Sequence, residues 1–96
     1  MSENITSPRP TMPEALSILK GCQPLAERLV LRGIIIELSA QDQAHLLNFE
    51  RLVLAEYNES EWSYLRVASG VKLNGVAALN SCLVRYQTLH KNSANN

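Results

Sequence analysis

Apolar residues recur at helical spacing in the middle of the chain. Leu46, Phe49, Val53 and Tyr57 are separated by three or four positions, which places them on one stripe of a helix over 40–57. Two further leucines widen this stripe, Leu47 and Leu54. Upstream, the run Ser39-Ala40-Gln41-Asp42 supplies a hydroxyl for the N-cap and an acid for the first turn. The pattern predicts a helix whose stripe is buried.

A second stripe predicts a closing helix over 74–90. Val76, Leu79, Leu83 and Tyr86 alternate at steps of three and four, which are the a and d positions of a heptad. Such a stripe is a candidate subunit contact. It can instead pack against the helix at 40–57 within the same chain, which is the more common arrangement, and the sequence leaves both alternatives open.

The first third of the chain is divided by proline and glycine. Thr11 is a candidate cap and Pro13 suits the first turn of a helix that runs until Gly21. Pro24 then starts a second helical segment that ends at Gly33. We expect the apolar run 34–38 to be an extended connector that buries under the helices.

These elements predict an all-α fold, a small bundle of three or four helices. The helix at 40–57 either continues to Ala68 or breaks at Asn58, which resembles a new cap. We expect a flexible, proline-containing arm over 1–12, one helical domain over 13–91 and a frayed tail over 92–96. No stretch alternates in the manner of a strand next to a hairpin signal.

Composition excludes several classes of protein. Nine basic residues balance nine acidic ones, and 46% of the residues are hydrophobic, as in a folded domain. No apolar run approaches the length of a membrane span, and no basic segment precedes an apolar block, so we expect a cytoplasmic protein that does not bind membranes. Cys22 and Cys82 do not form a disulfide pattern, and no Cys or His pair has metal-ligand spacing. We expect no catalytic residue, no metal, no cofactor and no small-molecule substrate.

Charge is distributed unevenly along the chain. Residues 14–61 hold eight acids and four bases, whereas residues 62–96 hold four bases and no acid. Those four bases are candidate contacts for DNA phosphates: Arg66, Lys72, Arg85 and Lys91. Pairing with the acids of the same or a neighbouring chain explains them equally well.

The segment around Gly70 also shares features with a helix-turn-helix. Leu65, Val71, Val76 and Leu79 occupy the apolar anchor positions of such a motif around the turn glycine. The position four residues before the glycine normally holds a small residue, because the two helices touch there. This chain has Arg66 at that position, which opposes the motif.

Over residues 13–91, the order of features resembles a helical family of small terminase subunits from tailed bacteriophages. The features that carry the resemblance are Leu25–Leu31, Gly33–Leu38, Ser39-Ala40-Gln41-Asp42 followed by Leu46–Arg51, Gly70 with Asn74, and Val76–Leu89. The resemblance implies a non-enzymatic protein of a bacterial host's cytoplasm that binds double-stranded viral DNA. It also implies assembly into a homo-oligomer and transfer of the DNA to a large ATPase–nuclease motor subunit.

Two other classes fit the same residues. One is a small helical protein-interaction module, such as a phage-encoded inhibitor or an antitoxin-like adaptor. The other is a helix-turn-helix-like transcription regulator, if Arg66 is tolerated.

Overall fold

The chain folds into four helices. The computed structural model describes residues 9–94, with side chains described up to residue 89. The helices are α1 (Met12–Arg32), α2 (Ala40–Ala55), α3 (Glu59–Ser69) and α4 (Leu73–Ala94). Over these described residues the fold is all-helical and contains no strand, which confirms the predicted fold class.

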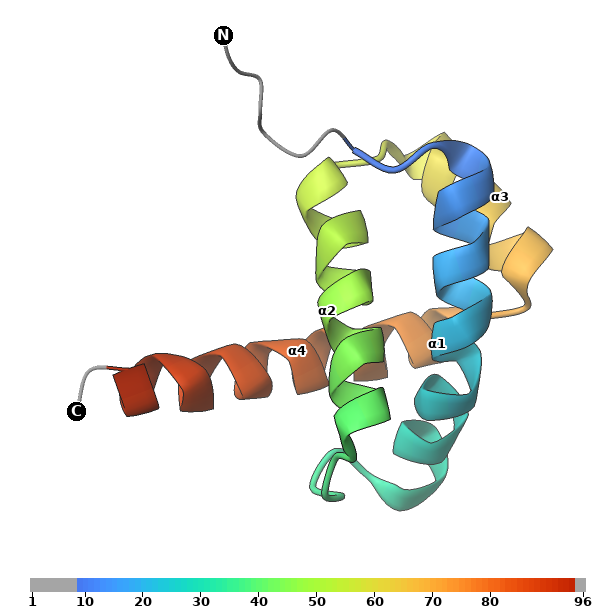
Figure 1. Cartoon of the computed structure of the whole chain (residues 1–96). Helices are drawn as coiled ribbons and strands as arrows, with labels where there is room; N and C mark the ends of the chain where they lie inside the picture. Colours follow the sequence, from blue (N-terminus) through green and yellow to red (C-terminus); the bar gives the residue numbers. More distant parts are fainter. Residues whose placement is uncertain (1–8, 95–96) are drawn as a thin grey trace, which may run out of the picture.

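Helix α1 is the centre of the bundle. It packs against each of the other three helices, and α2 also contacts α4. Helices α1 and α2 lie side by side and run in opposite directions, while α4 crosses them both (Figure 1). Among the described residues, no single helix is long and apolar enough to cross a membrane. Taken together, helices α3 and α4 have the length and composition of a membrane span, but the pair is bent by 106° at the turn between them.

The predicted interruption of α1 between Gly21 and Pro24 is wrong. Pro24 lies inside a continuous helix, where its missing N–H removes one backbone hydrogen bond at a cost of about 3 kcal/mol. The helix nevertheless carries one uninterrupted buried face, made of Ala15, Leu19, Cys22, Leu25, Ala26 and Leu29. Each buried leucine contributes about 1.5–3 kcal/mol, so packing outweighs the proline.

The ends of α2 and α3 are set by capping. Thr11 and Ser39 cap α1 and α2 as predicted. Helix α2 ends at Ala55, because Glu56 adopts a left-handed conformation with φ of 58°. Asn58 then caps α3 in a reciprocal capping box with Glu61. The break at Asn58 is therefore the alternative that the protein adopts.

The buried face of α2 differs from the predicted stripe. Leu46 and Phe49 are fully buried, but Val53 is 39% exposed and Leu52 is buried in its place. The two leucines expected to widen the stripe, Leu47 and Leu54, are also exposed. The predicted stripe includes Tyr57, which is buried but lies beyond the end of the helix. Because Tyr57 is not part of the helix, the buried face of α2 shifts by one position near its C-terminal end, from Val53 to Leu52.

The connector between α1 and α2 is irregular rather than a strand. Ile34, Ile36 and Leu38 are half-buried and pack against the core, as expected for an apolar connector. Ile35 is 78% exposed, which is a correction to the expectation that the whole run is buried.

The described end of the predicted arm is attached to the body. Arg9 forms an ion pair of 2.9 Å with Glu61 and lies over the ring of Tyr57, 4.5 Å from its centre. The Tyr57 hydroxyl donates a hydrogen bond to the Pro10 carbonyl. Residues 1–8 of the arm, and residues 95–96 of the predicted tail, lie outside the described residues. The backbone of 92–94 continues α4.

Helix α4 turns its heptad stripe towards the core. Leu79 and Leu83 are buried within the chain, and Val76 and Tyr86 are half-buried against the same core. These are the residues expected at a subunit contact, and their burial corresponds to the intrachain alternative. At Gly75, an added Cβ would lie 3.4 Å from the Cβ of Ala26, so α1 and α4 approach closely there.

Candidate interaction surface

Large apolar side chains gather where the end of α1 meets the turn between α3 and α4. We call this the corner surface: Val30, Leu31, Val67 and Leu73. Leu31, Val67 and Leu73 are 84%, 81% and 68% exposed. Two shallow grooves flank the turn and share Gly70, Val71 and Lys72, which joins these side chains into one surface.

The turn itself is rigidly built. Gly70 ends α3 in the left-handed region with φ of 83°. The Ser69 hydroxyl donates to the Arg66 carbonyl and also accepts the backbone N–H of Val71. Val71 is buried beneath the turn. The next residue, Lys72, is exposed just before α4 begins. The turn beside the corner surface is therefore held by hydrogen bonds of the Ser69 hydroxyl and of the Gly70 N–H.

The charges around the corner surface are mixed. Lys72 is on one rim and Glu27 lies across the groove beside it, where Gln23 donates a hydrogen bond to its carboxylate. Arg66 is half-buried and contacts the Ser63 hydroxyl at 3.4 Å. A mixed polar rim around apolar side chains is typical of protein–protein interfaces.

The helix-turn-helix hypothesis can be compared with this geometry. The turn is three residues long and the helices bend by 106°, both as in the motif. Leu65, Val71 and Leu79 are buried, as its anchors must be. However, Arg66 lies in a groove of about 390 Å³ that residues of α2, α3 and α4 line, which we call the α3–α4 groove. The motif brings two helices into contact at this position. The bulky residue thus occupies an open groove, and both helices pack on α1 instead.

The candidate DNA contacts are divided by the fold. Arg66 and Lys72 line the same groove at the corner. Arg85 lies in a different groove further along α4, and the side chain of Lys91 is outside the described residues. An acid also faces this region, because Glu59 lines the α3–α4 groove together with Arg66 and Asn80. The acid-free segment of the sequence therefore does not form an acid-free surface.

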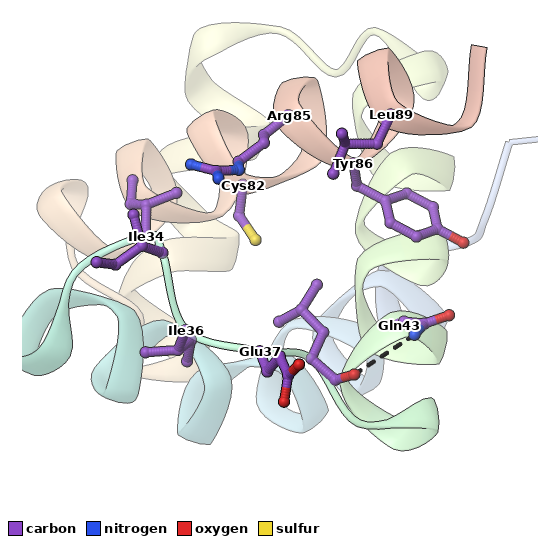
Figure 2. Close-up of a pocket in the computed structure, with 10 residues that line it drawn as sticks. Ile34, Ile36, Glu37, Gln43, Cys82, Arg85, Tyr86 and Leu89 are labelled. Carbon is purple, nitrogen blue, oxygen red and sulfur yellow. Dashed lines mark hydrogen bonds between the residues drawn. The ribbon is translucent and has the colours of Figure 1, made fainter. Parts of the chain in front are cut away.

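A further groove of about 470 Å³ lies between the connector and the second half of α4. Figure 2 shows that Ile34, Ile36 and Leu89 supply apolar walls, with Glu37 and Arg85 as the charged groups. Cys82 also lines this groove. Burial raises the pKa of the Cys82 thiol, an effect that Arg85 partly opposes, so the thiol stays protonated and is a poor nucleophile.

The other cysteine is equally inert. Burial raises the pKa of the Cys22 thiol to about 12, and its Sγ donates to the His45 carbonyl at 3.3 Å. Both cysteines are free thiols. Within the part of the chain that the structure describes, no three His, Cys, Asp or Glu side chains lie close enough to hold a metal ion.

Sequence reasoning missed the exposed side of α4. Leu73, Ala77, Asn80 and Val84 point away from the core. The signal was present, since positions that fall between the members of the heptad stripe must face outwards. Leu73 was missed for a second reason, because the closing helix is predicted to begin at residue 74, whereas α4 begins at Leu73.

Comparisons of the chain with protein-family models, with curated proteins and with solved structures find no match. The resemblance to small terminase subunits therefore stays a prediction.

Proposed function

We propose that this chain is a small helical protein-interaction module that binds a partner protein through the corner surface and is not an enzyme. The single observation that carries the proposal is the exposure of Val30, Leu31, Val67 and Leu73 in two adjoining grooves that flank one turn. Monomeric soluble proteins rarely expose large contiguous apolar patches, and polar-rimmed ones mark interaction sites.

The surrounding charges support a protein partner. Lys72 and Arg66 are matched by Glu27 and Glu59 around the same grooves, so the surface has no strong net charge. Nucleic-acid affinity depends on an excess of cations opposite phosphates. An apolar centre with a balanced rim suits the side chains of a folded protein partner.

The test is site-specific photo-crosslinking in cells that express the full chain. A benzophenone amino acid replaces Val67 or Leu31, and the matched control carries it at Lys20, an exposed position of α1. We expect a discrete protein adduct from the two corner positions only. Adding Val30→Glu, which lies in the corner surface, should abolish it, because a carboxylate would be desolvated in the apolar contact. Adducts from all three positions, or from none, would contradict the proposal.

A second candidate function is DNA binding of the terminase type, in the cytoplasm of a bacterial host. It is favoured by Arg66 and Lys72, which line one groove. One protomer offers few phosphate contacts, so useful affinity would require a homo-oligomer that engages one duplex together and passes it to a large motor subunit.

Mobility-shift titrations at two salt concentrations test this candidate. Replacing Arg66 and Lys72 by alanine should weaken binding of any duplex and flatten the slope of log K against log salt by about 1.8. Lys20→Ala removes one positive charge from an exposed position of α1 and serves as the control. Absence of binding by the unaltered protein at low salt would reject the DNA candidate.

A further inference from the structure

The first half of α4 has an unusual composition for a helix at a protein surface. The twelve residues Leu73–Val84 contain no charged side chain, and the nearest charges are Lys72 and Arg85 at the two ends. Each of the other three helices carries both acids and bases. A helix at a protein surface normally presents charged and polar side chains to solvent, and this segment presents only uncharged ones.

Only one side of this segment is covered within the chain. Ala78, Leu79, Cys82 and Leu83 are buried against the bundle. The opposite side consists of a stripe at steps of four, three and four residues, which we call the outer stripe: Leu73, Ala77, Asn80 and Val84. Its ends are large and apolar, with Leu73 68% and Val84 61% exposed. Its centre combines a small residue, Ala77, with a polar one, Asn80.

We propose that the outer stripe is covered by the same stripe of a second copy of this chain, in an antiparallel, two-fold contact. This inference goes beyond the proposed function, because it concerns a second surface and a defined partner. Leu73 alone belongs to both surfaces.

The arrangement of the stripe is self-complementary. A two-fold axis midway between Ala77 and Asn80 sets Leu73 level with the partner subunit's Val84, and Ala77 level with the partner subunit's Asn80. Large apolar residues then meet at both ends. Ala77 allows the helices to approach closely, and an isolated Asn at such a seam specifies register. Antiparallel helices also align their dipoles favourably.

Charge supports the same occupant. The stripe of a second copy itself carries no charged side chain, because Lys72 and Arg85 lie beyond its two ends. The nearest opposite charges, Glu59 and Arg66, line the groove beside Leu73 and Asn80 and balance each other. The seam is about 18 Å long at 1.5 Å per residue, which is short beside a standard interface of about 1,600 Å². We therefore expect a dimer with a dissociation constant in the micromolar range, so that the fraction of dimer depends on the protein concentration.

Light scattering coupled to size-exclusion chromatography, over a hundredfold range of concentration, tests the dimer. We expect the mass to rise from one chain to two. Ala77→Glu should keep the mass at one chain throughout, with an unchanged helical spectrum, because it places two carboxylates at the seam. Ala44→Glu makes the same substitution at an exposed position of α2 and should still dimerise.

Two results would overturn the proposal. One is an unaltered protein that stays monomeric at the highest concentration. The other is a dimer that survives Ala77→Glu, which would place the contact elsewhere. Neither result affects crosslinking at Val67 and Leu31, so the dimer proposal and the corner-surface proposal are tested independently.

Engineered cysteines test the orientation. In an antiparallel seam, a mixture of Leu73→Cys and Val84→Cys chains should form a mixed disulfide. Neither variant should crosslink to itself, because equivalent positions lie about 16 Å apart, beyond disulfide reach. Cys22 and Cys82 are buried and add little background. Self-crosslinking of either variant would overturn the antiparallel arrangement.

Discussion

At the scale of single residues, two glycines have opposite roles in stability. Gly70 has φ of 83°, a conformation that costs other residues about 1–2 kcal/mol. Gly21 lies inside α1, where alanine is favoured over glycine by about 0.5–1 kcal/mol, and its added Cβ would lie 3.5 Å from the His45 ring. We expect Gly70→Ala to lower the free energy of unfolding and Gly21→Ala to raise it, as measured by urea denaturation.

The two variants serve as controls for each other, because each adds one methyl group. A Gly70→Ala protein as stable as the parent would contradict the left-handed end of α3. A destabilised Gly21→Ala protein would contradict the ordinary contact with His45. The sequence marks Gly21 as a helix end and Gly70 as a turn glycine. Only the backbone shows that their roles differ, because nothing local indicates that α1 continues past Gly21.

At the scale of helices, the sequence predicted caps better than continuity. Thr11 and Ser39 were identified correctly because capping depends on a hydroxyl and the next three residues. The continuity of α1 through Pro24 depends on leucines that pack against three other helices, which no local signal reports. The misplaced Val53 has a similar origin, since a stripe chosen by spacing cannot show where the helix ends.

The candidate surfaces were predictable only in part. The stripe of Val76, Leu79, Leu83 and Tyr86 was found from spacing, but spacing alone does not say whether it faces a core or a partner. The corner surface combines residues from three helices that are distant in sequence, so its exposure required the tertiary fold. Arg66 and Lys72 come together there for the same reason.

At the scale of the whole molecule, α4 is used on two sides. Its heptad stripe of Val76, Leu79, Leu83 and Tyr86, the inner stripe of α4, packs against the core that α1 and α2 also form. Its outer stripe, with the corner surface at one end, is left for other molecules. Two adjacent residues separate these roles, because Leu83 is 4% exposed and Val84 is 61% exposed.

Aspartate at these two neighbouring positions should therefore give two different molecules. Leu83→Asp buries an uncompensated carboxylate in the core, which costs several kcal/mol, a large part of the roughly 5–15 kcal/mol that stabilises a typical domain. We expect it to lose helical circular dichroism at room temperature. Val84→Asp leaves its carboxylate in water in the single chain, so the helical spectrum should persist while light scattering reports one chain at every concentration. A folded Leu83→Asp protein would show that the inner stripe is not core, and a dimeric Val84→Asp protein would show that the outer stripe is not the seam.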